Sequence, residues 1–216
     1  MAIEEITREQ WETLLNRYAS FKKLFIECEE TDPELNTNMQ PMNELRAVLD
    51  HLIRVIAIEK LGSTEYDVKS QFDKLSSHIR RAFFDVCDML AINYRNKIVD
   101  ALTPFSSKVI IVAVDNYYKE IKPFIGSLDL RIADYRNNKG KEEIEESIVV
   151  AYEEDVLKLK DFYLSILDRL EALEELQAEE NEAKTVEKKN RTTDRIIGII
   201  VGAAGIIAGV LIAIFA

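Results

Sequence analysis

A run of 21 residues without a charged or strongly polar group ends the chain, from Ile196 to Ala216. As a helix, this run reaches about 31 Å at about 1.5 Å per residue, which matches the hydrocarbon thickness of a bilayer. Helices buried in soluble domains rarely hold so long an apolar stretch. The sequence therefore predicts one transmembrane helix over residues 195–216 in a tail-anchored, single-pass protein.

The residues just before this run are mostly basic. Five basic residues precede it: Lys184, Lys188, Lys189, Arg191 and Arg195. Only Glu187 and Asp194 oppose them, and an excess of positive charge marks the cytosolic side of a membrane helix. The N-terminus has neither the basic nor the apolar part of a secretory signal. We therefore expect an N-terminal domain in the cytosol and a span in a membrane, with the bacterial inner membrane as the favoured one.

The predicted span carries small residues on one face. They recur every three or four positions: Gly198, Gly202, Gly205, Gly209 and Ala213. Small residues at this spacing let helix backbones approach closely in lipid. The stripe predicts a homo-oligomer that forms through the membrane helix, with a passive anchor as the alternative. Because the span has no polar side chain, backbone and small side chains would line any pore.

The preceding 194 residues contain three glycines and four prolines, which are few turn-forming residues for a fold of many strands. We expect an all-α bundle of about five to six helices, with a cytosolic domain over residues 1–178 and a charged linker over 179–194. Cys28 and Cys87 lie in apolar helical contexts, as small core residues do. No disulfide, metal site or cofactor is expected.

The first three helices have recognisable ends. Thr7-Arg-Glu-Gln10 has the form of a capping box, so Thr7 begins the first helix. Pro41 suits the first turn of the second helix and Gly62 its end. On the second helix, apolar residues recur at helical spacing: Met42, Leu45, Leu49, Leu52, Ile53 and Ile56. The three helices are expected over residues 7–30, 41–61 and 66–102.

A fourth helix is expected over residues 104–124, closed by Gly126. Residues 109–114 are mainly β-branched and also allow a short buried strand. A short helix from Ser127 or Asp129 should follow and end at Gly140, which we interpret as a hinge.

An acidic helix is expected over residues 141–178. It carries apolar residues at alternating intervals of four and three: Tyr152, Val156, Leu159, Tyr163, Ile166, Leu170 and Leu173. This repeat predicts a coiled-coil-like seam, either between copies or packed within its own monomer. Residues 141–182 hold fifteen acidic side chains against four basic ones, so direct binding of nucleic acid is not expected.

One pattern on the second helix suggests catalysis. The segment Arg46-Ala-Val-Leu-Asp-His51 resembles the arginine, four to six residues, histidine motif of the HEPN superfamily of helical RNases. The resemblance implies that Arg46 and His51 act as a phosphate-stabilising and acid/base pair on RNA, although Ala47 stands where the family usually has a polar residue. Alternatively, Arg46, Asp50 and Arg54 form an ion-pair stripe. Because five residues place Arg46 and His51 about 140° apart around the helix, the catalytic interpretation requires a dimer.

A basic group on the third helix is the candidate ligand site. His78, Arg80 and Arg81 could bind a small anionic ligand or nucleotide, with an ordinary polar helix face as the alternative.

Three classes of function fit these features. A helical domain joined to one self-associating span resembles, in architecture, small membrane effectors of bacterial antiviral defence, which kill or arrest an infected cell. A membrane adaptor or tether and a membrane-bound HEPN-type RNase are the alternatives. We favour a non-enzymatic effector that senses a protein partner or signal and acts on the lipid bilayer.

Overall fold

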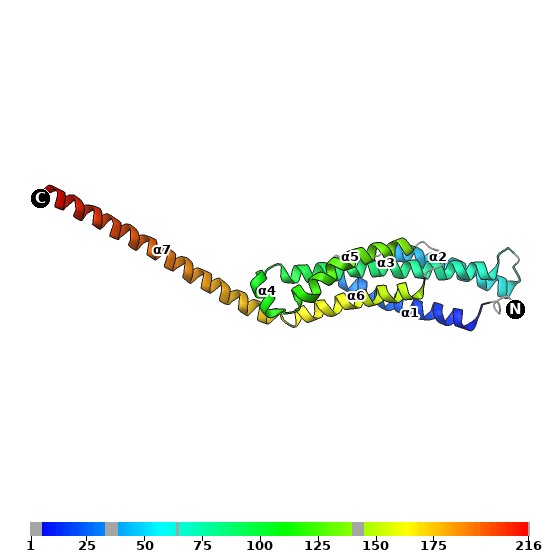
Figure 1. The fold of residues 1–216 in the computed structure, drawn as a ribbon. Coiled ribbons are helices and arrows are strands. Elements are labelled where there is room, and N and C mark those ends of the chain that lie inside the picture. The colour runs from blue at the N-terminus through cyan, green and yellow to red at the C-terminus, as the bar shows by residue number, and fades with distance from the viewer. Residues whose placement is uncertain (1–5, 33–38, 64, 140–144, 216) are drawn as a thin grey trace. The chain divides into compact units, whose positions relative to one another are not determined.

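The computed structural model describes residues 6–32, 39–63, 65–139 and 145–215, with side chains up to residue 199. Within these ranges every regular element is a helix (Figure 1), which confirms the all-α prediction. The chain forms two compact units. The first comprises Met1–Thr103 and Asn116–Leu167, and the second comprises Pro104–Asp115 and Asp168–Ala216.

The predicted start of the first helix and the predicted end of the second are confirmed. α1 (Arg8–Thr31) begins at a capping box in which Thr7 Oγ1 accepts from the Gln10 N–H and the Thr7 N–H donates to Gln10 Oε1. α2 (Met39–Leu61) ends at Gly62, whose φ of 65° lies in the left-handed region that glycine adopts without strain. Both ends follow from local chemistry.

The central helix of the first unit is α3 (Val68–Leu102), whose N-cap is Asp67. Four helices pack on it: α1, α2, α5 (Lys122–Lys139) and α6 (Glu146–Leu167). Because α3 is surrounded, the successive residues Phe83 and Phe84 are both buried, although they point to different sides of the helix. This helix therefore positions the four helices that pack on it.

The prediction of one helix over residues 104–124 is wrong. α4 (Ser107–Ala113) is helical, which excludes the strand alternative for residues 109–113, but the chain turns at residues 114–116. A π-helical turn, η2 (Tyr117–Ile121), then leads into α5 (Lys122–Lys139). The wider turn accommodates Pro123, whose ring would otherwise press on the carbonyl of the preceding turn.

Gly126 does not end a helix, which corrects a second expectation. It lies inside α5, where no neighbouring side chain comes within 4 Å of the position its Cβ would take. α5 continues because Leu128, Ile132 and Tyr135 are buried on one face. The hinge predicted at Gly140 lies outside the described residues.

The prediction of one acidic helix over residues 141–178 is also wrong. α6 (Glu146–Leu167) ends in a turn at residues 168–169, and α7 (Leu170–Phe215) begins after it. α6 buries six residues: Val149, Tyr152, Val156, Leu159, Phe162 and Ile166. They pack within the first unit, where α6 contacts α3 and α5, so this part of the seam is used inside its own monomer.

The second unit joins α4 to the start of α7. Ser106 caps α4 by accepting from the Val109 N–H, and its own N–H donates to Gln177 Oε1 at 2.7 Å. Its hydroxyl donates to Glu180 Oε2 at 2.5 Å, and this bond is the main cause that lowers the pKa of Glu180. Leu173 is buried in the same unit. The linker predicted over residues 179–194 is therefore continuous helix in α7.

Candidate functional site

The two histidines of the chain lie side by side between α2 and α3. The rings of His51 and His78 stack with their centroids 5.2 Å apart and their planes 24° from parallel. His51 is only 8% exposed, and its Nδ1 donates to Gln71 Oε1 at 2.8 Å. The packing of α2 on α3 thus brings together residues from two candidate sites that are separate in the sequence.

A carboxylate from α2 completes this cluster. Glu44 Oε2 accepts from His78 Nδ1 at 2.7 Å and from Arg81 Nε at 3.0 Å. Arg81 also donates through Nη1 to Ser77 Oγ at 3.0 Å. Burial acts to raise the pKa of Glu44, but the hydrogen bonds from His78 and Arg81 outweigh it, so the pKa lies below its ordinary value. The ionised carboxylate therefore holds both basic side chains.

Removing this carboxylate should change the stability of the protein in acid. Because the folded state lowers the pKa of Glu44 below 4.5, its stabilisation is complete above that pH and is lost as the pH falls through the folded value. Glu44→Gln should cost about 1–2 kcal/mol at pH 7 and should flatten the loss of stability in acid. The measurement is denaturant unfolding of the full chain in neutral detergent, followed by the fluorescence of Trp11.

The matched control is Glu154→Gln, which changes an exposed glutamate of α6. This variant should keep the acid dependence of the wild type. If the free energy of unfolding of Glu44→Gln fell as steeply with pH as that of the wild type below about pH 4.5, the stabilising role of the ionised Glu44 would be contradicted.

Arg46 and His51 are not brought together within one chain. Arg46 is exposed on α2, whereas His51 is buried against α3. The predicted ion-pair stripe is confirmed for its second pair, in which Arg54 Nη2 lies 2.6 Å from Asp50 Oδ2. A general acid or base has to reach its substrate, and this arrangement holds the imidazole inside the helix interface.

The basic group on α3 divides between two surroundings. His78 and Arg81 turn towards Glu44, whereas Arg80 is 7% exposed and lies near Arg17 and Glu146. Burial is the main cause that lowers the pKa of Arg80, with the charge of Arg17 as the next. Arg80 Nη2 and Arg81 Nη1 both donate to Ser77 Oγ, at 3.5 Å and 3.0 Å, whereas Glu44 accepts from His78 and Arg81.

Sequence reasoning missed Glu44 and Gln71 as members of this cluster. Glu44 precedes His51 by seven residues, which is two helical turns, so both lie on one face of α2. That spacing was the available signal. The residues of α3 that bind Glu44 and His51 are 20–37 residues away in the sequence, and only tertiary packing identifies them.

A second polar network ties α5 and α6 to the rest of their unit. Asp88 of α3 accepts from Arg136 Nε at 2.9 Å and from the Tyr152 hydroxyl, and Asp85 pairs with Lys139. Burial raises the pKa of Asp85, as it does the pKa of Tyr152. A similar group links α6 to α5: Asp155, Arg131 and Tyr135. These groups bond one another and hold the helices together.

Both cysteines are fully buried, which confirms the prediction that Cys28 and Cys87 are core residues. Burial raises the pKa of the Cys87 thiol well above its ordinary value. In the described part of the chain no group of three or more candidate ligands is placed to hold a metal ion.

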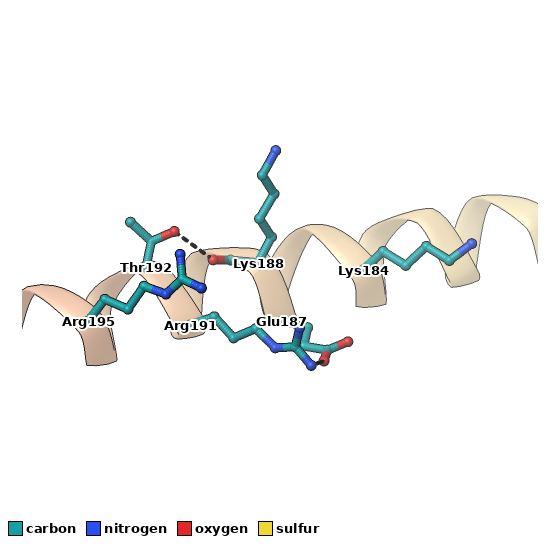
Figure 2. Close-up of a pocket in the computed structure, with 6 residues that line it drawn as sticks. All are labelled: Lys184, Glu187, Lys188, Arg191, Thr192 and Arg195. Atoms are coloured by element: carbon teal, nitrogen blue, oxygen red, sulfur yellow. Dashed lines mark hydrogen bonds and ion pairs between the residues drawn. The ribbon is translucent and has the colours of Figure 1, made fainter.

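The basic residues before the predicted span share one face of α7 (Figure 2). They follow at intervals of four, three and four: Lys184, Lys188, Arg191 and Arg195. Lys184 pairs with Glu180 at 3.0 Å, and Arg191 pairs with Glu187 at 2.8 Å. All four side chains are exposed. This face is thus available to an anionic surface.

The predicted span lies mostly beyond the described side chains. Gly198 is described, with open space where a Cβ would lie, whereas the side chains of Gly202, Gly205, Gly209 and Ala213 are outside the described set. Among the residues searched, no helix contains a segment of the length and apolarity that crossing a bilayer requires.

Comparisons with known proteins returned no match. No family model, no curated protein and no solved structure is similar to this chain. Its function is therefore argued from its own residues.

Proposed function

We propose that this protein is a membrane-anchored effector. Its helical domain responds to a partner or signal, and its final helix self-associates in a bilayer and damages it, as in an abortive infection response to a virus. The observation that carries the proposal is the run of 21 uncharged residues from Ile196 to Ala216, directly after a basic face of α7. A helix of this length and composition is stable in lipid because all its backbone polar groups bond internally.

The basic face supports attachment on the cytosolic side. Lys and Arg side chains beside an anionic membrane surface contribute about 1 kcal/mol each. Lys188 and Arg195 are both exposed on α7: Arg195 directly precedes the apolar run, and Lys188 lies about two turns before it. They would contact lipid headgroups where the helix enters the bilayer.

The small-residue stripe supports self-association. Lipid supplies no hydrophobic drive between helices, so close backbone contact along small residues stabilises their association. Gly202 and Gly205 lie at the centre of the stripe. Leucine at both positions would separate the helices at their closest approach.

The test is controlled expression of the full chain in a bacterium, with growth and membrane potential followed together. The wild type should arrest growth and depolarise the membrane. Gly202→Leu/Gly205→Leu should restore both, because bulky side chains block close helix packing. The matched control, Ala203→Leu/Ala204→Leu, changes positions off the stripe and should stay toxic.

His51→Ala separates this proposal from an RNase. The effector predicts that His51→Ala remains toxic and depolarising, since the span carries the activity. Toxicity lost only with His51→Ala would favour the HEPN-type RNase. Normal growth and potential with the wild type would leave two alternatives, an effector that needs a trigger absent from the bacterium and an adaptor or tether.

A further inference from the structure

An apolar groove of about 440 Å³ lies between α1 and α2, both of which pack on α3. Leu75 and Ile79 of α3 line it, together with Leu15 and Tyr18 of α1 and Leu49 of α2. All these residues belong to the first unit. The groove is thus a feature of one compact body, with apolar contributions from three helices.

A ridge of exposed apolar residues runs along α2 beside this groove. Leu49 is 57% exposed, Ile53 is 56% exposed and Ile56 is 49% exposed. Met42, two turns before Leu49, is also exposed on this face. Across the groove, Leu15 of α1 is 60% exposed. Single exposed apolar residues are ordinary, but a continuous patch of them marks an interaction surface.

The ridge is exposed because α2 turns its other side to α3. His51 and Val55 are the residues that α2 buries at this level. His51 donates a hydrogen bond to Gln71, and its ring stacks on His78. Both contacts hold this side of α2 against α3. The polar cluster between α2 and α3 therefore forces the stripe of Leu49 and Ile53 outwards.

We propose that this face binds a second copy of the chain, so that the α2 ridge of each copy lies in the groove of the other. A two-fold dimer uses the same patch on both subunits, and here a ridge and a groove of matching apolar chemistry lie next to each other. This surface is distinct from the membrane stripe and from the seam of α6, which is buried in its own monomer.

The exposed area is sufficient for a stable dimer. Six side chains on this face expose about 600 Å² per copy, so a dimer would bury about 1,200 Å² in total, which exceeds the roughly 1,000 Å² that a specific interface needs. The six are Leu15, Tyr18, Met42, Leu49, Ile53 and Ile56.

Cysteine crosslinking of the full chain in neutral detergent tests the proposal. Cysteines are placed singly at Met42, Leu49, Ile53 and Ile56, and an oxidant is added. Because a disulfide requires Cα atoms within about 7 Å, at least one position near the two-fold axis should give a covalent dimer. Cys28 and Cys87 are buried and should not react. Leu130→Cys, at a residue of α5 that is 74% exposed, is the control for chance collisions.

Two further variants separate this dimer from association of the span. Leu15→Glu, combined with the most reactive ridge cysteine, should lower crosslinking at least about tenfold, because it puts a charge into the groove. Far-UV circular dichroism should show that this exposed substitution leaves the fold intact. Gly202→Leu/Gly205→Leu should leave crosslinking unchanged, so failure of the proposed membrane function would not affect this result.

Ridge crosslinking no greater than at Leu130 would overturn the proposal. So would crosslinking that Leu15→Glu leaves unchanged, or that the glycine substitutions abolish. In the last case the cysteines would meet only because the membrane helices associate.

Discussion

Ile206→Arg/Ile207→Arg should release the full chain from the membrane fraction into the soluble fraction. Each arginine at the centre of a span costs about 2.5–3.5 kcal/mol, and each Ile, Leu, Val or Phe contributes only about −0.3 to −0.6 kcal/mol. The predicted span holds twelve such apolar residues, two of which this variant removes. The two arginines therefore cancel the favourable transfer energy, which is about −4 to −7 kcal/mol in total.

Alkaline carbonate extraction of bacterial membranes measures this effect. The matched control is Ile206→Leu/Ile207→Leu, which keeps the apolar character and should remain in the carbonate-resistant pellet. A chain that stays in the pellet with both arginines would contradict the predicted span, and a wild type extracted by carbonate would do so too.

Tyr152→Ala should cause the largest loss of stability of any change considered in the helical unit. Tyr152 is 0% exposed, and its ring stacks on Tyr135 with centroids 4.3 Å apart and meets Phe84 edge to face at 5.7 Å. Truncating a buried aromatic side chain to alanine costs about 3–5 kcal/mol, because it removes apolar burial and leaves a cavity. Domains have only about 5–15 kcal/mol in total, so this single change should remove a large part of the stability of the unit.

Tyr152→Phe separates the ring from the hydroxyl. It removes only the hydrogen bond to Asp88, which keeps its bond from Arg136, so we expect a loss of about 1 kcal/mol. Denaturant unfolding in neutral detergent, with circular dichroism and Trp11 fluorescence, compares the two variants. A loss below about 1 kcal/mol for Tyr152→Ala would contradict the packing of α6 against α3 and α5.

The ends of α1 and α2 could be predicted from the sequence because their causes are local. The capping box at Thr7 and Gln10 needs residues three positions apart, and Gly62 ends α2 through its own backbone freedom. The helical class followed from the apolar spacing of these segments. Each signal lies within a few residues of the feature it determines.

The breaks after α4 and α6 could not be predicted in this way. The apolar spacing stays helical through residues 109–124, and the seam of Tyr152, Val156 and Leu159 continues in phase to Leu173. Because the repeat does not change at residues 168–169, it gives no sign that its two parts belong to different units. Periodicity identifies which face is apolar, but it does not identify the element that covers that face.

The candidate site was predictable only in part. His51, His78 and Arg81 were recognised as chemically distinctive residues, but they were assigned to two unrelated sites. Glu44, which binds His78 and Arg81, is 34 and 37 residues from them, so no local pattern connects the three.

The sequence by itself determined that the described chain is helical, where α1, α2 and α3 begin or end, and that its last 21 residues are uncharged. Only the tertiary structure decided which side of α2 is buried. Leu49 and Ile53 are apolar, as core residues are, yet they are exposed. The side of α2 that packs against α3 is the one that carries His51 and Val55. A helix with apolar residues on several sides can bury any of them, and contacts with distant helices select the one that is covered.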